Sequence, residues 1–193
     1  MRTSAIPTAT RRPDRTVSGK RRDPSRAERA VAHKRGGKVK APAANGEPPR
    51  LTLTIQSTVD AIDLPKRPTL RRWALATLDR DANVTLRLVD GRESRALNRR
   101  YRGRDHATNV LTFVYDDRVS LTGDIVLCAP VVEKEARTQR KTRRAHYAHL
   151  VIHGMLHLQG YDHERDDDAA RMEAREITLL RGLGFGDPYA ANA

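Results

Sequence analysis

Cysteine is almost absent from this 193-residue sequence, in which Cys128 is the only one. An intrachain disulfide and a zinc site built from cysteines are therefore both excluded. Because Cys128 lies in the apolar run Ile125–Ala129, we expect a small core residue rather than a nucleophile. A single cysteine is also compatible with a reducing compartment, and we expect a cytoplasmic location.

Long apolar runs are missing as well. No stretch approaches the roughly 20 apolar residues of a membrane span. The N-terminus has no apolar segment of the kind found in secretory signals. Its high arginine content is similar to that of an organelle transit peptide. Transit peptides form amphipathic helices, however, and Pro7, Pro13 and Pro24 interrupt any helix there. We therefore expect a basic extension rather than a targeting segment, and no membrane partner.

Large apolar side chains are scarce in residues 1–49. Such a segment cannot bury enough surface to offset the entropy of ordering, so a disordered extension is predicted. It holds thirteen Lys and Arg against four Asp and Glu, a net charge of +9, whereas residues 50–193 carry only +4. A total of +13 suggests a polyanionic partner such as nucleic acid. A solvated basic tail explains the composition equally well.

Regular apolar periodicity begins at about residue 50. Alternating and β-branched runs predict four strands, at residues 51–55, 84–89, 109–115 and 124–128. Helical spacing predicts helices at residues 68–78, 94–101, 143–158 and 166–183, and another that starts at Pro130. Strands and helices alternate early, and helices dominate late. This order predicts one α/β (α+β) domain over residues 50–190, with a sheet of about four strands.

One segment concentrates residues that bind metals. His153 and His157 are four apart in a predicted helix, so both imidazoles lie on one face, one turn apart. Gly160 can adopt positive φ and turn the chain, so that His163 returns towards the pair. Three imidazoles with an open fourth position are typical of catalytic zinc. The spacing therefore predicts one Zn²⁺ per chain, held by His153, His157 and His163.

The same spacing occurs in the metalloprotease motif H-E-x-x-H-x-x-G-x-x-H, with one difference. Gly154 stands where the proteases have the glutamate that acts as general base. Asp162 adjoins a predicted ligand, and we expect it to support that ligand or cap a helix rather than to catalyse. His149, four residues before His153, either supports a ligand or has a surface or packing role. The sequence identifies no general base.

The segment His153–His163 reads H-G-M-L-H-L-Q-G-Y-D-H. It resembles the motif H-G-x-L-H-L-x-G-[YWH]-D-H of the YbeY family of bacterial rRNA-processing proteins. Two further blocks agree with that family: Leu97–Asp105 is similar to L-N-x-x-[YF]-R-x-x-D, and Thr108–Phe113 to T-[ND]-V-L-[ST]-F. Gly123–Val126 matches the G-D-I strand. The resemblance covers about residues 50–190 and does not extend to the basic N-terminal segment.

The resemblance implies a small mixed sheet, a zinc-bearing helix and a metal-dependent, single-strand endoribonuclease. It implies action in 16S rRNA maturation, late ribosome assembly and ribosome quality control in the bacterial cytoplasm. The implied partners are rRNA, the small ribosomal subunit and its assembly factors.

The resemblance also places Arg102 beside the metal cleft, where a guanidinium can hold a phosphate in bidentate fashion. A surface salt bridge is the alternative for Arg102. Arg99, Arg100 and Arg104 lie in the same block, and each either lines the RNA path or is simply solvated.

Two other functions stay open. The histidine spacing favours a metalloprotease, whereas Gly154 and the basic charge argue against one. A non-catalytic ribosome assembly factor with a structural zinc also fits the sequence. Metal removal, combined with assays on RNA and on a protein substrate, separates these functions from an endoribonuclease.

Overall fold

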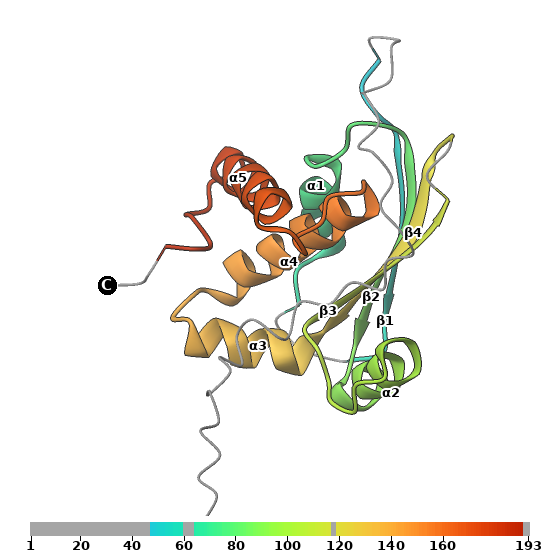
Figure 1. Cartoon of the computed structure of the whole chain (residues 1–193), viewed down its shortest axis with the longest axis vertical. Coiled ribbons are helices and arrows are strands. Elements are labelled where there is room, and N and C mark those ends of the chain that lie inside the picture. Colours follow the sequence, from blue (N-terminus) through green and yellow to red (C-terminus); the bar gives the residue numbers. More distant parts are fainter. Residues whose placement is uncertain (1–46, 60–63, 117–118, 191–193) are drawn as a thin grey trace, which may run out of the picture.

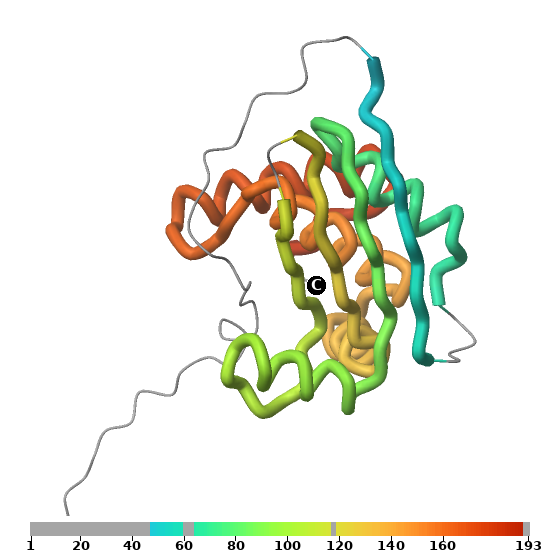
Figure 2. The backbone as a smooth tube through the Cα atoms, turned by 90° about the vertical axis from the view of Figure 1, so that its right-hand side faces the viewer, coloured from blue at the N-terminus to red at the C-terminus, as the bar shows by residue number. Residues whose placement is uncertain are grey.

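A four-stranded mixed sheet forms the centre of the computed structural model, which describes residues 47–59, 64–116 and 119–190. β1, β2 and β4 are parallel, and β3 runs antiparallel to β4. The order across the sheet is β1-β2-β4-β3 (Figure 2). The α/β fold class predicted from the sequence is confirmed. The strands are β1 (Leu51–Ser57), β2 (Ala82–Val89), β3 (Val110–Asp116) and β4 (Leu121–Cys128).

The helices lie mainly on one face of the sheet. Figure 1 shows α1, α3, α4 and α5 on that face and α2 at one end of the sheet. Around α2, Leu97 packs on a small apolar cluster that includes Cys128, which is buried as expected. The helices are α1 (Arg67–Leu75), α2 (Gly91–Arg102), α3 (Ala129–Thr138), α4 (Arg143–Leu158) and α5 (Asp166–Gly182).

Helix α4 is the central element of the core. Every residue from His146 to Leu158 is buried, because the sheet, α1, α3 and α5 all pack around this helix. Most of its side chains are apolar, as expected for a helix that is buried all round. Its four histidines are exceptions, and a buried imidazole needs a hydrogen-bond partner or a metal.

Two glycines allow α4 to approach the sheet closely. A Cβ atom added to Gly123 in β4 would lie 2.4 Å from the carbonyl oxygen of Phe113 and 2.5 Å from Cδ2 of Leu158. A Cβ atom added to Gly154 in α4 would lie 2.9 Å from Cγ2 of Ile125. Packing this tight fixes the position of α4, and therefore of its histidines, relative to the sheet.

Helix α1 is shorter than the sequence predicts. The apolar spacing extends it to Leu78, but the helix ends at Leu75. The side chain of Gln159, at the end of α4, holds the residues that follow α1. It donates to the carbonyl of Thr77 at 3.0 Å and accepts from the backbone N–H of Asp79 at 3.0 Å. These long-range hydrogen bonds replace the last helical turn, which local periodicity could not indicate.

The predicted basic extension, residues 1–49, lies outside the described residues except for its last three. The boundary near residue 50 therefore stays a prediction, although β1 begins directly after it at Leu51. Among the residues that the structure describes, no helix is both long and apolar enough to cross a membrane.

Candidate metal centre

Three histidines meet at the C-terminal end of α4. His153 and His157 bring their Nε2 atoms within 3.0 Å of each other. The ring centroid of His163 lies 4.8 Å from that of His157 and 5.5 Å from that of His153. One ring nitrogen from each residue lies within 4.8 Å of the others, close enough to hold one ion. The structure thus brings together the three histidines singled out by their spacing; we call them the histidine cluster.

A tight turn after α4 positions the third histidine. Gly160 has φ 88°, a left-handed conformation that glycine adopts without steric cost. The backbone N–H of Tyr161 donates to the carbonyl of Leu156 at 3.0 Å, which closes the helix end. Asp162 Oδ1 accepts from the backbone N–H of His163 at 2.7 Å, so this carboxylate supports the turn.

The other ring nitrogens of the first two histidines are held by acceptors. His153 Nδ1 lies 2.7 Å from Glu176 Oε1, and His157 Nδ1 lies 2.9 Å from the carbonyl oxygen of Tyr161. A carboxylate and a carbonyl only accept, so each Nδ1 carries the hydrogen and each Nε2 presents a lone pair.

Two lone pairs that face each other at 3.0 Å repel unless a cation lies between them. Tetrahedral zinc with Zn–N bonds of about 2.0–2.1 Å separates two ligand nitrogens by roughly 3.3 Å. The donor set and its spacing therefore fit a metal ion bound by imidazole.

The electrostatics of the site agree with this assignment. Burial, followed by the nearby charges of His153 and His163, lowers the pKa of His157 well below its usual value. His157 is therefore neutral at pH 7, as a metal ligand must be. Burial alone would raise the pKa of Glu176, but His153 and His149 outweigh it and hold that pKa well below the usual range. Glu176 therefore stays a carboxylate.

Glu176 is the site residue that sequence reasoning missed. It is 0% exposed, and its Oε2 accepts from His149 Nε2 at 3.2 Å and from the hydroxyl of Tyr189. Since His149 is buried against this carboxylate, the surface alternative for His149 is wrong. A signal was present: Met172, Glu176 and Leu180 are four residues apart and form the buried stripe of α5. A carboxylate within an apolar stripe marks a buried functional or structural partner.

A second group of side chains is also close enough to bind an ion: His149, His153 and Glu176. An ion there would need the Nδ1 atom of His153, which now hydrogen-bonds to Glu176. It would also leave the facing Nε2 atoms of His153 and His157 without a cation. The geometry therefore favours the histidine cluster, with Glu176 orienting one of its rings.

Arg102 lies at the C-terminal end of α2 and is half-buried. Its buried Nε has no hydrogen-bond partner, and no described carboxylate pairs with it. The surface salt bridge considered as an alternative is thus not formed within the described part of the chain. Burial, followed by the charge of Arg104, lowers the pKa of Arg102 to about 10, so the guanidinium is still cationic at neutral pH. A half-buried cation without a carboxylate is available to an anion.

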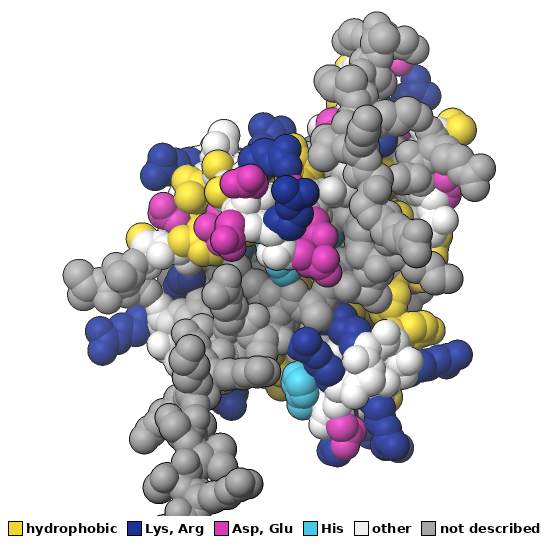
Figure 3. All heavy atoms as spheres, in the orientation of Figure 1, with side chains coloured by type: hydrophobic (Ala, Val, Ile, Leu, Met, Phe, Trp, Pro, Cys, Tyr) yellow, Lys and Arg dark blue, Asp and Glu magenta, His cyan; other side chains and the backbone are white. Residues whose placement is uncertain are grey.

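The neighbouring arginines form a cationic surface. Figure 3 shows the dark blue side chains of Lys and Arg gathered over α2. Arg99 and Arg100 are exposed, and both line a shallow pocket on this helix. The guanidinium of Arg100 also lies over the ring of Tyr101, 5.4 Å from its centroid. Arg104, after the helix, is half-buried.

Comparison with known proteins points to one family. The family model described as Endoribonuclease YbeY matches residues 61–184. Two curated proteins named Endoribonuclease YbeY are each 56% identical to the chain. The one from Nitrosomonas europaea aligns over 139 residues, 72% of this chain and 85% of the relative. The one from Aromatoleum aromaticum aligns over 144 residues, 73% of this chain and 94% of the relative.

Among solved structures, the solution structure of TM1509 from Thermotoga maritima is 27% identical, with a TM-score of 0.47. The match covers 72% of this chain and 99% of that one. The range matched by the family model contains the histidine cluster, Arg102 and Glu176.

Proposed function

The chain belongs to the YbeY family of endoribonucleases, and on that basis we propose that it is a zinc-dependent enzyme that cleaves single-stranded RNA. Its proposed roles are 16S rRNA maturation, late ribosome assembly and ribosome quality control. Its partners are then rRNA, the small ribosomal subunit and the assembly factors of that subunit, in the bacterial cytoplasm. One observation above all supports the metal: the facing Nε2 atoms of His153 and His157, 3.0 Å apart.

In this proposal one zinc ion per chain is held by His153, His157 and His163. Glu176 and the carbonyl of Tyr161 fix two of the rings, so that their Nε2 lone pairs converge on one point. Zinc, when bound, polarises a phosphoryl oxygen and acidifies water. Three protein ligands leave the remaining position to water or substrate, which is the arrangement of catalytic sites.

Arg102 is the proposed phosphate ligand. A guanidinium binds two phosphate oxygens at once and stabilises the negative charge that grows as the phosphodiester is cleaved. Its burial strengthens this interaction, because a partly desolvated cation is attracted more strongly to an anion. Arg99, Arg100 and Arg104 are proposed as weaker contacts to the flanking RNA backbone.

The position of Gly154 argues against a metalloprotease. Such an enzyme uses the glutamate at this position as general base, and general acid–base catalysis is worth roughly 10²–10⁴-fold. Here the position faces Ile125 in β4, and even a Cβ atom would lie 2.9 Å from its Cγ2. A glutamate side chain has no room at residue 154. Cleavage of a phosphodiester depends less on that carboxylate, since a metal and an arginine can stabilise the charge.

Assays of the full-length, zinc-loaded protein on single-stranded rRNA fragments and on casein test the function. We expect RNA cleavage that a chelator abolishes, and no casein cleavage. Casein cleavage at rates typical of metalloproteases, without RNA cleavage, would make the protein a peptidase. Binding to the small ribosomal subunit, with neither substrate cleaved, would make it a non-catalytic assembly factor.

Replacing Arg102 with glutamine separates catalysis from stability. We expect Arg102→Gln to slow RNA cleavage by about 10²–10³-fold, the usual effect of removing one donor that stabilises transition-state charge. Zinc content should not change. The melting temperature should not fall either, because the buried Nε has no partner to lose.

The matched control for this variant is Arg175→Gln, which removes an exposed cation from α5. It should cleave RNA at the wild-type rate. Equal rates for Arg102→Gln and Arg175→Gln would remove Arg102 from the substrate site.

A further inference from the structure

A large groove adjoins the histidine cluster. It has a volume of about 1130 Å³ and is formed by the start of β3, by α3 and the turn after it, by α4, and by the C-terminal segment. His153 belongs both to the groove lining and to the histidine cluster. Pockets for single small molecules usually measure about 300–1,000 Å³. This groove is large enough for a segment of a polymer that continues from the metal centre.

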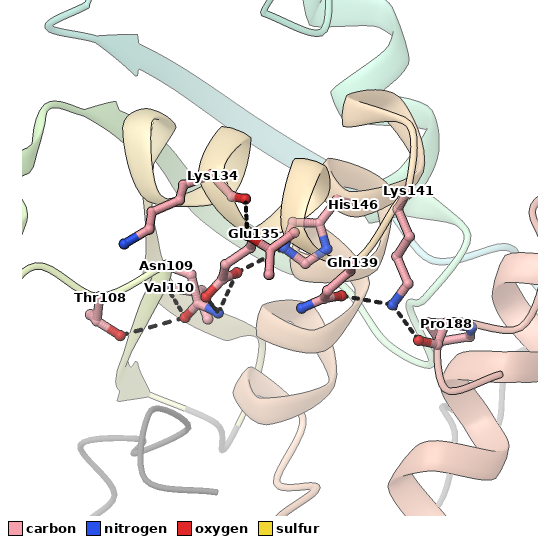
Figure 4. A network of polar contacts seen from close by, with 10 residues as sticks. Thr108, Asn109, Val110, Lys134, Glu135, Gln139, Lys141, His146 and Pro188 are labelled. Atoms are coloured by element: carbon pink, nitrogen blue, oxygen red, sulfur yellow. Dashed lines mark hydrogen bonds and ion pairs between the residues drawn. The ribbon is translucent and has the colours of Figure 1, made fainter. Parts of the chain in front are cut away.

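The polar side chains of the groove form a network in which the carboxylate of Glu135 is engaged in hydrogen bonds (Figure 4). Among the described residues of the lining, Glu135 supplies the only carboxylate. Both of its oxygens accept from Asn109 Nδ2, at 3.2 and 3.1 Å, and its Oε2 lies 2.8 Å from His146 Nε2. An incoming anion therefore meets a carboxylate whose charge is already shared with two donors.

The other charged side chains among the described lining residues are cations. Lys134 and Arg140 are exposed on α3 and on the turn that follows it. Lys141 is oriented by hydrogen bonds to the side chain of Gln139 and to the carbonyl of Pro188 (Figure 4). Three cations against one engaged carboxylate make the groove complementary to a polyanion. A neutral or cationic ligand would not use this charge balance.

The backbone at Arg140 carries a second, independent signal. Arg140 has φ 51° and is the only non-glycine residue with positive φ in the described ranges. It ends α3: its N–H donates to the carbonyl of Arg137 at 3.1 Å, and the N–H of Lys141 donates to that of Ala136 at 2.8 Å. Helices that end in this way usually place glycine or asparagine at the left-handed position. An arginine is disfavoured there, and residues held in such conformations cluster at functional sites.

We propose that this groove binds the substrate RNA strand beyond the scissile phosphate, with Lys134 and Arg140 as phosphate contacts. The proposal rests on the proposed function, since it names the path of the substrate that reaches the same metal centre. Among the apolar side chains of the lining, the half-buried Val131 gives an unpaired base a surface to lie on. The occupant is single-stranded, because only unstacked bases expose their faces to a protein surface.

The test measures the affinity of the full-length, zinc-loaded protein for a fluorescent 2′-O-methyl RNA 12-mer, which has no 2′-hydroxyl, at several salt concentrations. The variants are Arg140→Asn and the double variant Lys134→Ala/Arg140→Asn. The control is Arg72→Asn, which removes an exposed cation from α1 outside the groove. For single strands, each phosphate contact contributes about 0.7 to the slope of log affinity against log salt.

We expect the slope to fall by about 0.7 for Arg140→Asn and by about 1.4 for the double variant, and to stay unchanged for Arg72→Asn. The melting temperature of Arg140→Asn should equal or exceed that of the wild type, because asparagine tolerates positive φ better than arginine. A slope equal to that of Arg72→Asn, or a clear loss of thermal stability, would overturn the groove proposal.

The binding and cleavage results together distinguish failure of the groove proposal from failure of the proposed function. Cleavage of unmodified RNA by the wild type, with unchanged binding by Arg140→Asn, overturns the groove and supports the function. The reverse result, with groove-dependent binding and no cleavage, supports the groove and overturns the function.

Discussion

Replacing His157 with alanine is expected to lower the zinc content from about one ion per chain to near zero and to abolish RNA cleavage. In the proposed site His157 provides one of three protein ligands, and its neutral Nε2 faces that of His153 at 3.0 Å. Its pKa is depressed chiefly by burial, so no proton competes for this nitrogen at pH 7. Metal analysis of the purified protein and a single-stranded RNA cleavage assay measure the two effects.

Two further variants separate metal loss from unfolding. His157 is fully buried and its Nδ1 bonds the carbonyl of Tyr161, so the alanine variant also loses stability. His163 lies after the helix and is half-buried, and His163→Ala should lose zinc with a smaller effect on the fold. His106→Ala, at an exposed histidine outside the cluster, is the control and should keep both zinc and activity. Full zinc content in a folded His163→Ala protein would contradict the assignment.

Replacing Glu176 with glutamine is expected to weaken zinc binding by about 10–100-fold, the usual effect of removing a carboxylate that orients a ligating histidine. The shape of the side chain is kept, but the amide cannot accept from both His149 and His153. One of these buried donors then faces an N–H₂ group, which costs about 1–3 kcal/mol of stability. Competition with a chromophoric chelator measures the affinity, and thermal denaturation measures the stability.

The control for this variant is Glu173→Gln, three residues earlier on α5 and outside both candidate ion groups. It should bind zinc as the wild type does. Unchanged affinity in Glu176→Gln, together with a lower melting temperature, would give Glu176 a purely structural role. Loss of zinc as complete as in His157→Ala would show that Glu176 itself ligates the ion, in the group with His149 and His153.

The sequence predicted helix α4 and its histidines well because every signal there is local. The spacing of His153 and His157, the glycine at residue 160 and the bounds of the helix all depend on residues within one or two turns. Helix α4 spans Arg143–Leu158, as the periodicity indicated, and Gly160 has the positive φ expected of it. Local spacing fixes which side chains share a face, and that was sufficient to bring the three histidines into one prediction.

Element boundaries were less well predicted where capping or pairing decided them. Helix α2 was expected to begin at Ser94 but begins at Gly91, because the side chain of Asp90 accepts from the backbone N–H of Glu93 at 2.8 Å. β4 was expected from Asp124 but begins at Leu121, which pairs with Ala82 in β2. The N-cap of α2 could have been predicted from Asp90, whereas the pairing of β4 with β2 depends on residues about forty positions away.

The groups that surround the histidine cluster could not be predicted from the local sequence pattern. Glu176 lies 23 residues after His153, and only the packing of α5 on α4 brings them together. The groove has the same origin, since it is lined by β3, α3, α4 and the C-terminal segment. Sequence reasoning found the three histidines in and just after one helix, and the fold supplied the carboxylate, the carbonyl of Tyr161 and the groove that surround them.

The most direct test of the account is a zinc titration of the metal-free, full-length protein, followed by single-stranded RNA cleavage at each step. If the histidine cluster is the catalytic metal site, the cleavage rate rises from background in proportion to added zinc and reaches a plateau at about one equivalent per chain. The His157→Ala protein should show no rise over the same range. Cleavage by the metal-free wild type at the plateau rate, or an equal response in His157→Ala, would contradict the account.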